Sequence, residues 1–388
     1  MGRTTREDNG AGDLLAVLRR AGACSRGDLV RRTGLARATV SQRLDALVAH
    51  GYVVRVEGAS TGGRPPEIFR FNSSGGVVLA ADIGGSHTRV GMADLAGELL
   101  SENETDLDVT RGPKQVLGWV LGEFERLLEA SGRDATDVRG IGIGVPGPVE
   151  FETGRLVSPP IMTGWDGFVV PDFFADQFGG PVVVDKDANV MALGEHRNAW
   201  SAHPHMVMLK VGMGIGCGII ANGELVRGAQ GSGGDIGHIP RGEDRPCRCG
   251  YRGCTEATAG GWAIARDLAE AGLEVQTSEQ IVALTRSGNP EAVKLVRQAG
   301  RVLGEVVADV IGVLNPSVVV VGGNLSACRE PLLAGIREIV YSRSQPLATR
   351  DLQLTYSRLL HQAGLVGASL LVRDAIFAPD AVNAVVHG

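Results

Sequence analysis

The first 72 residues show a helical pattern followed by a strand pattern. Apolar residues recur at helical spacing in three short stretches between about residues 12 and 51, and the third stretch aligns Val40, Leu44, Leu47 and Val48 on one face. Ser25, with Asp28 three residues later, is typical of a capping box that starts the second helix. Alternation in 53–57 and 68–71 predicts a two-stranded hairpin. We therefore predict a winged helix-turn-helix domain over residues 1–72.

The third predicted helix presents polar side chains to DNA. Thr39 and Gln42 point away from its apolar face and Arg37 and Arg43 flank it, so these four are the expected base or phosphate contacts. The loop 58–66 contains Gly-Arg-Pro, in which Arg64 would suit a narrow, negative minor groove. A solvated loop is the alternative for that segment, and a protein-binding winged helix is the alternative for the whole unit.

The distribution of charge favours DNA binding by this first domain alone. Residues 1–72 contain 12 Arg and 7 Asp or Glu, a net charge of +5, whereas the whole chain carries −6, which leaves −11 for the remainder. A length of 388 residues predicts two or three domains. The polar first nine residues, and the lack of an apolar run of membrane-spanning length, predict a cytoplasmic protein without membrane contact.

Beyond residue 72 the pattern becomes that of an α/β protein. Residues 77–93 and 206–223 each read as strand, glycine-rich turn and strand, which predicts two similar lobes that face a cleft. We place lobe 1 at 73–200 and lobe 2 at 201–362. Such turns expose N–H groups that can hold phosphates, although many only reverse the chain, and neither is a Walker loop. Residues 140–148 read as a buried strand that ends in a constrained loop, and 315–324 as a strand that ends in glycines. The strand in 182–189 ends in carboxylates, at the position where α/β proteins place ligands.

One short segment of lobe 2 concentrates metal-binding side chains. His238, Cys247, Cys249 and Cys254 form a Cys3His set that fits tetrahedral Zn²⁺. Four protein ligands leave no position for water, so the zinc is expected to be structural. The alternatives are a disulfide or buried thiols without metal, but a reducing compartment favours a metal site.

Taken in order, these segments resemble the ROK family of repressors, open reading frames and sugar kinases. The resemblance runs from about Leu14 to near the C-terminus and rests most strongly on the glycine, histidine and cysteine motif between Gly231 and Glu256. It implies an actin/hexokinase-like (ribonuclease H-like) domain of two βββαβα lobes, in which residues 363–388 return to pack on lobe 1. It also implies homodimers or homotetramers, and the fused winged helix places the chain in the transcriptional-regulator branch of bacterial sugar repressors.

The resemblance also implies roles for individual residues. Asp187 matches the base that accepts a sugar hydroxyl proton in the kinases. Sugar contacts are implied for Lys186, Asp187, Asp235, His238 and Glu256, with His238 also binding zinc. The residues that match the family's nucleotide-phosphate positions are Asp82, Gly84, Gly85, Ser86, Gly212, Gly214, Gly216, Gly218, Gly322 and Gly323.

The chain departs from the family pattern in three places. Lys186 stands where asparagine is usual, and lysine donates hydrogen bonds but cannot accept them, so it could instead recruit an anionic sugar or sugar phosphate. Asp235 replaces a glutamate and withdraws its carboxylate by one methylene. Met213 replaces a threonine and Ser86-His87 replaces Thr-Lys, which weakens the case for ATP more than the case for sugar. Asp187 is then a ligand contact without catalysis.

We therefore predict a sugar-responsive transcriptional regulator, a repressor of carbohydrate-uptake or catabolism genes that a sugar in the cleft releases from double-stranded operator DNA. The first alternative is an ATP-dependent, glucokinase-like sugar kinase with a regulatory head, and only then is Mg-ATP a cofactor. The second alternative is a regulator that takes its signal from a protein partner. The sugar, and whether it is phosphorylated, are left open.

Overall fold

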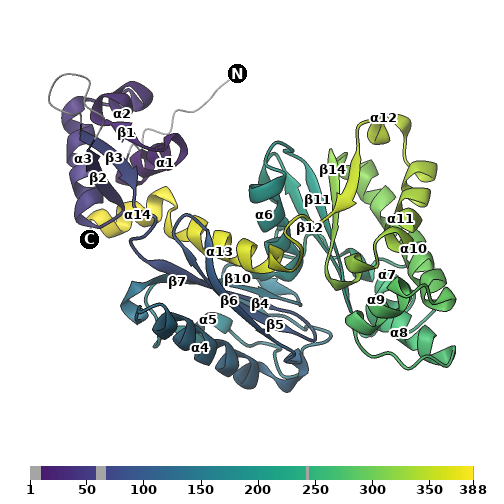
Figure 1. Cartoon of the computed structure of the whole chain (residues 1–388). Helices are drawn as coiled ribbons and strands as arrows, with labels where there is room; N and C mark the ends of the chain where they lie inside the picture. Colours follow the sequence, from purple (N-terminus) through teal and green to yellow (C-terminus); the bar gives the residue numbers. More distant parts are fainter. Residues whose placement is uncertain (1–9, 58–66, 242–243, 388) are drawn as a thin grey trace.

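The computed structural model describes residues 10–57, 67–241 and 244–387, which form a head, two lobes and a long C-terminal segment that joins them (Figure 1). The head contains three helices, α1 (Ala11–Ala21), α2 (Arg26–Thr33) and α3 (Arg37–Ala49). Its strands β1 (Cys24–Ser25), β3 (Glu67–Phe71) and β2 (Val53–Glu57) form one sheet in that order. The predicted winged helix-turn-helix is confirmed.

Local signals in the sequence explain the helices of the head. The Ser25 hydroxyl oxygen accepts from the Asp28 N–H at 3.1 Å, and the Asp28 carboxylate accepts from the Ser25 N–H at 2.9 Å, which completes the capping box of α2. Gly51 follows α3 with a φ of 73°, the left-handed conformation that ends many helices. The predicted apolar faces then form a buried core that includes Leu14, Leu18, Leu44, Leu47 and Phe69.

Lobe 1 is built on a five-stranded sheet in the order β10-β7-β4-β5-β6. Its strands are β4 (Val77–Ile83), β5 (Thr88–Asp94), β6 (Leu99–Thr105), β7 (Val138–Val145) and β10 (Val182–Lys186). Strands β4, β7 and β10 are parallel, whereas β5 and β6 run antiparallel to their neighbours. Helix α4 (Pro113–Ala130) packs on one face of this sheet, and α13 (Ala363–Ile376), from the end of the chain, packs on the other. Helix α6 (Asp187–Ala199) follows β10 and packs mainly on the sheet of lobe 2. Smaller elements are η1 (Val109–Arg111), η2 (Ala135–Asp137), β8 (Val149–Glu150), β9 (Arg155–Leu156) and α5 (Val170–Phe174).

Lobe 2 repeats this plan with the order β13-β12-β11-β14-β15. Its strands are β11 (Met206–Val211), β12 (Ile215–Ala221), β13 (Glu224–Leu225), β14 (Val318–Gly322) and β15 (Gln353–Tyr356). The outer face packs against helices that include the long α10 (Pro290–Leu314). The remaining elements are η3 (Ile236–His238), α7 (Thr255–Ala259), α8 (Gly261–Glu270), α9 (Ser278–Arg286), η4 (Asn324–Cys328), α11 (Glu330–Arg343), α12 (Pro346–Thr349) and η5 (Leu360–Gln362).

The two repeats meet through equivalent helices. Helix α6 follows β10 in lobe 1 and α13 (Ala363–Ile376) follows β15 in lobe 2, and the two helices pack against each other. A Cβ atom at Gly367 would lie 1.6 Å from the carbonyl oxygen of Val190, so only glycine allows this close approach of the two backbones. The ends of both sheets are thereby held on either side of one cavity.

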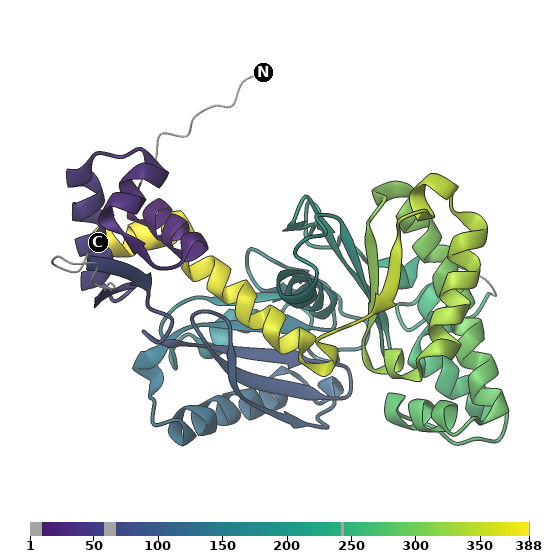
Figure 2. The ribbon, with the colours of Figure 1, turned by 45° about the horizontal axis from the view of Figure 1, so that its top comes forward.

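The C-terminal residues do not all lie where they were predicted, on lobe 1. Helix α13 packs on β4 and β7 of lobe 1, but α14 (Pro379–His387) lies against α1 of the head rather than on lobe 1 (Figures 1 and 2). The Asn383 side chain accepts from the N–H of Gly12 at 2.8 Å, and the Phe377 ring meets Tyr52 and Phe71 edge to face. The sequence pattern marks α14 as amphipathic without saying which surface its apolar side covers. No helix among the described residues is long and apolar enough to cross a membrane.

Candidate functional site

A cavity of about 440 Å³ lies between the two lobes, at the ends of their central strands. Lobe 1 lines it with the turn after β4 and with the junction between β10 and α6. Lobe 2 lines it with the turn after β11 and with the loop that carries the cysteines. All five predicted sugar contacts line this cavity, namely Lys186, Asp187, Asp235, His238 and Glu256.

Asp187 begins α6 and points into the cavity as half of an ion pair. Its Oδ2 atom accepts from the ammonium of Lys210 on β11, and its Oδ1 atom accepts from the Ala188 N–H at 2.6 Å. Burial alone would lower the pKa of Lys210, but attraction by Asp187, with smaller contributions from Asp82 and Glu256, raises it above its usual value. Lys210 is therefore a fixed positive charge at this point of contact between the lobes.

The two residues before Asp187 also bind lobe 2. Asp185 is 1% exposed, and its carboxylate accepts from Arg227 Nε at 2.7 Å and from Asn189 Nδ2 at 2.6 Å. The Arg227 guanidinium also lies 3.7 Å from the centre of the Phe151 ring, which fixes it between the lobes. Lys186 donates to the carbonyl oxygen of Gly233. Three successive residues of lobe 1 thus each bond to lobe 2.

Glu256 is a buried acceptor held in place by lobe 2. Its Oε2 atom accepts from the Ile215 N–H at 3.0 Å, and its Oε1 atom accepts from Trp262 Nε1 at 3.2 Å. A Cβ atom at Gly214 would lie 2.8 Å from Oε2, so glycine is needed for the turn to come this close to the carboxylate. Asp235, in contrast, is exposed at the start of η3.

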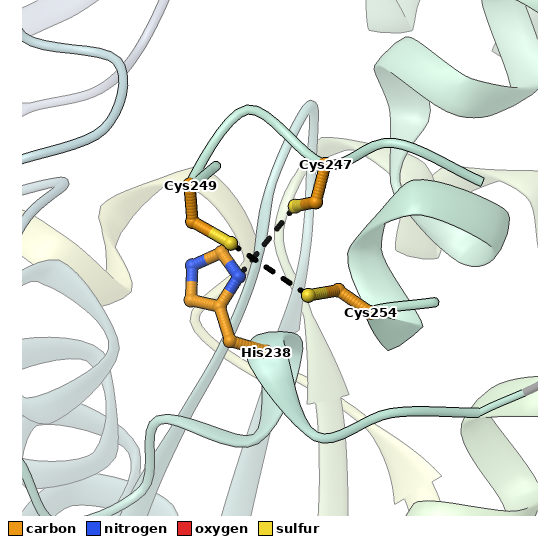
Figure 3. Close-up of side chains that lie close together, drawn as sticks. All are labelled: His238, Cys247, Cys249 and Cys254. Carbon is orange, nitrogen blue, oxygen red and sulfur yellow. Dashed lines mark hydrogen bonds between the residues drawn. The ribbon is translucent and has the colours of Figure 1, made fainter. Parts of the chain in front are cut away.

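The four predicted metal ligands converge beside these acceptors (Figure 3). Their ligand atoms all lie within 4.8 Å of one another; the sulfurs of Cys249 and Cys254 are 3.6 Å apart, and Cys247 Sγ is 3.7 Å from His238 Nδ1. Zinc–sulfur and zinc–nitrogen bonds of about 2.3 and 2.0 Å give tetrahedral edges of about 3.5–3.8 Å, so the cluster fits that ion. The separation between the sulfurs of Cys249 and Cys254 is longer than the roughly 2.05 Å of a disulfide bond, so these two thiols are not bonded to each other.

The metal cluster and two sugar contacts share the same short elements. His238 ends η3, which Asp235 immediately precedes, and Cys254 immediately precedes α7, which carries Glu256. The His238 Nδ1 atom faces the cysteines, which leaves Nε2 on the other side of the ring (Figure 3). One ion at this cluster would therefore fix the positions of both carboxylates as well as the imidazole.

The predicted phosphate-side residues divide into two groups. The residues that line the cavity are Gly85, Ser86, Gly212, Gly214 and Gly216. The others lie beneath its surface: Gly84 packs against His87, Gly218 against the Ala188 carbonyl, Gly323 against Val211, and Gly322 against Met208 and Met191. Burial raises the pKa of Asp82, at the end of β4, to about 6, while Lys210 opposes the shift.

His87 does not supply the positive charge of the lysine that it replaces in the family pattern. Burial, followed by repulsion from Arg89, lowers the pKa of His87 to about 4, so the imidazole is neutral near pH 7. The turn after β4 therefore brings no positive charge of its own to a phosphate. Met213, in the equivalent turn of lobe 2, lines the cavity without a hydroxyl group.

The head presents the predicted DNA contacts on α3. Arg37 and Gln42 are exposed, and Thr39 and Arg43 are half-buried on the same helix. Arg64 lies outside the described residues. The helix-turn-helix arrangement thus leaves the polar side of α3 open for a groove of DNA.

Comparisons with known proteins agree with this division into head and lobes. A model of the ROK family matches residues 78–375, and a model of the MarR family matches residues 8–64. The chain belongs to the ROK family. It is 28% identical to the xylose repressor of Caldicellulosiruptor bescii, over 92% of this chain and 93% of that protein. A solved ROK family transcriptional regulator, a homologue of the E. coli MLC protein, has a TM-score of 0.82 and 27% identity, and the match covers 97% of this chain and 98% of that one.

Kinases of the ROK family match a smaller part of the chain. The glucokinase of Thermotoga maritima is 30% identical over 77% of this chain and 98% of that protein. The regulators are thus the relatives that match head and lobes together, which agrees with the predicted regulator branch.

Two residues of the site were missed in the sequence. Lys210 interrupts the apolar run of β11 two residues before a glycine turn, and it is one of only four lysines in the chain, so a signal for it was present. Arg227 follows the two-residue strand β13 in a loop without periodicity, and no sequence signal identifies its partner Asp185.

Proposed function

We propose that this ROK protein is a sugar-responsive transcriptional regulator, a repressor of genes for carbohydrate uptake or catabolism. One observation carries the proposal: the five residues matched to sugar contacts line a single cavity in a chain that also carries a winged helix-turn-helix. The xylose repressor and the ROK regulator cited above, which match nearly the whole chain, support the same reading.

The chemistry of the cavity suits a neutral, polyhydroxylated ligand. Asp187, Asp235 and Glu256 offer carboxylate acceptors, and His238 Nε2 is available while Nδ1 faces the metal cluster. Sugar hydroxyls donate to such acceptors in pairs, which is why carboxylates recur in sugar sites. Lys186 donates to Gly233, so a sugar phosphate would have to compete for that ammonium. We expect neutral sugars to be preferred.

We propose Zn²⁺ as the structural ion of the cluster formed by His238, Cys247, Cys249 and Cys254. The ligand types and separations support zinc over harder cations, because thiolates and imidazole favour it. When bound, the ion supplies a rigid link between η3 and α7. The chain's own residues then do the recognition, with Asp235 and Glu256 held at fixed places on the wall of the cavity.

A continuous chain of contacts supports coupling between the cavity and the head. Helix α6, which begins at Asp187, packs on α13, and α13 leads directly into α14, which contacts α1. Asn383 of α14 satisfies an N–H in the first turn of α1, where Gly10 offers no capping side chain. A ligand that changes the lobe angle would therefore act on the head, provided that it binds the two states with different affinity.

The remaining parts of the proposal concern assembly and location. A cytoplasmic homodimer or homotetramer would present two heads to a pseudo-palindromic operator, with Arg37, Thr39, Gln42 and Arg43 as contacts. Sedimentation of the protein with and without a duplex would measure both the oligomeric state and the number of heads bound.

Sugar kinase activity is the second candidate, and the glycines of both turns favour it. In that case Asp187 would be the base and Mg-ATP the co-substrate. Neutral His87 and the apolar Met213 weaken the nucleotide side, which favours the sensor.

A titration of the full chain with D-xylose, D-glucose and their phosphates, with and without Mg-ATP, separates these functions. Calorimetry would report binding, and a coupled assay would report ATP consumption. A sensor binds a sugar without consuming ATP. Sugar-dependent ATP turnover at kinase rates would contradict the proposal, and so would a lack of binding by every sugar.

A further inference from the structure

Lys210 occupies a place in the cavity that neither the sequence pattern nor the sugar-contact residues account for. It lies on β11, opposite Gly216 of β12 and beside Gly322 of β14, so the two neighbouring strands place no side chain next to it. A Cβ atom at Gly216 would be 3.1 Å from Ala188 Cβ and 4.0 Å from Asp187 Oδ1. This face of the sheet therefore points at the first turn of α6, and Lys210 reaches Asp187 across it.

The hydrogen-bonding capacity of Lys210 is largely unused. An ammonium has three N–H donors, and within the described part of the chain its one hydrogen bond is to Asp187. The side chain is 20% exposed, and that exposure is toward the cavity it lines. Lys186 differs, because its ammonium donates to a backbone carbonyl of the opposite lobe.

We propose that Lys210 is a ligand-contacting residue that determines specificity, acting with Asp187 to hold two neighbouring hydroxyl groups of a sugar. This inference rests on the proposed sugar-sensing function. Lysine can only donate and a carboxylate can only accept, so the pair fixes one hydroxyl through its oxygen and the next through its hydrogen. Inversion of either hydroxyl removes a partner from a buried charged group, which is a strong basis for discrimination between epimers.

The test uses the full chain and Lys210→Met, which keeps the length of the side chain and removes its charge. Lys294→Met is the matched control, because Lys294 is exposed on α10 and pairs only with Glu291 among the described residues. Calorimetry with D-glucose, its epimers D-mannose and D-galactose, and D-xylose would give the affinity ranking of each variant. We expect Lys210→Met to weaken the best sugar about 10- to 100-fold and to flatten the ranking, while Lys294→Met leaves both unchanged.

A double-mutant cycle keeps the test decisive if Lys210→Met folds poorly with an unpaired Asp187. Asp187→Asn combined with Lys210→Met leaves no unpaired charge, so this variant should fold. If Lys210 holds a hydroxyl of its own, the double variant binds the best sugar more weakly than Asp187→Asn alone and has a flatter ranking. A double variant with the affinity and ranking of Asp187→Asn would show that Lys210 acts only as the partner of Asp187 and would overturn the ligand contact.

The outcomes distinguish this inference from the function on which it rests. If the wild type binds none of the sugars, the proposed function fails and the inference falls with it. If the wild type binds a sugar and Lys210→Met keeps the same affinity and ranking, only the inference is overturned. A wild type that phosphorylates the sugar, and a Lys210→Met variant that loses turnover but not affinity, would assign Lys210 to phosphate and also overturn it.

Discussion

The two lobes share a strand order but place opposite charges at the same position of their central strands. Asp82 of β4 and Lys210 of β11 both precede a glycine turn, and both pair with a glycine of the next parallel strand, Gly144 and Gly322. Asp82 lies against the first turn of α13, where a Cβ atom at Gly364 would be only 2.0 Å from its Oδ2 atom. A carboxylate suits this helix start because its N–H groups carry partial positive charge.

Lys210 faces the equivalent helix start, and its charge is opposite to that of Asp82. Its ammonium meets the N-terminus of α6, an unfavourable place for a cation unless an acid is present, and Asp187 is the first residue of that helix. The repeated fold thus places two equivalent strand ends opposite equivalent helix starts, and we propose that Lys210 contacts the ligand whereas Asp82 has a structural role. Substitutions that affect one lobe and not the other can test this difference.

The largest expected effect comes from the metal cluster, which has no counterpart in lobe 1. Cys254→Ser should release the ion, lower the melting temperature by about 10 °C or more and abolish the response to sugar, because Glu256 and Asp235 lose their common support. Metal analysis and thermal melting would measure both. Cys328→Ser makes the same change at a buried position outside the cluster and should keep the metal and the response. A zinc-free protein that still responds to sugar would refute this role.

Glu195 provides a second contrast, between two acids on one helix. It is fully buried on α6, and it accepts from Trp200, from the Ser357 hydroxyl and from the Leu359 N–H, whereas Asp187 on the same helix faces the cavity. Glu195→Ala should cost about 3–5 kcal/mol of unfolding free energy, because three donors lose their partner. Urea denaturation would measure this, with the exposed Glu224→Ala as control. A loss of less than 1 kcal/mol would show that the contact is not structural.

Much of this architecture was predictable because it depends on local spacing. The capping pair Ser25 and Asp28 and the stripe from Val40 to Leu47 specify the head without reference to distant residues. The four metal ligands lie within one loop, so their spacing alone indicated the cluster. The five cavity residues were found through a family resemblance, not through periodicity.

The parts that sequence reasoning missed depend on contacts between lobes. Lys210 meets Asp187, and Arg227 meets Asp185, only because α6 and the two sheets are packed together. Likewise α14 could cover any apolar surface, and its contact with α1 depends on where α13 ends. Such pairings are properties of the assembled fold, so no local sequence pattern predicts them.

The pH dependence of the free energy of unfolding should reveal the raised pKa of Asp82. An unfolded aspartate has a pKa of 3.8, whereas the folded value is about 6, so the folded state holds the proton more tightly. Stability contributed by this group is present below about pH 4 and is lost as the pH rises to about 6, a change on the order of 2–3 kcal/mol. Asp82→Asn should therefore stabilise the protein at pH 7. Urea denaturation at a series of pH values should show that its free energy of unfolding lacks the decrease between about pH 4 and 6 that the wild type shows. The same decrease in both proteins would contradict the burial argument.

The smallest expected effect concerns the link to the head. Asn383→Ala removes the acceptor for the Gly12 N–H and should cost about 1 kcal/mol of stability in the head, with sugar affinity unchanged. The sugar-dependent change in DNA affinity should shrink, because the contact of α14 with α1 is weakened. Asp380→Ala, at an exposed position of the same helix, is the control. Unchanged regulation in Asn383→Ala would place the coupling elsewhere.

In the proposed function, a sugar between the lobes controls the DNA affinity of the head. Fluorescence anisotropy on a duplex selected from a random library by the full chain, with and without the sugar that binds most tightly, tests it directly. We expect the sugar to weaken DNA binding at least about tenfold, which corresponds to a coupling free energy of about 1.4 kcal/mol. A sugar that saturates the cavity and leaves the DNA affinity unchanged would contradict the account.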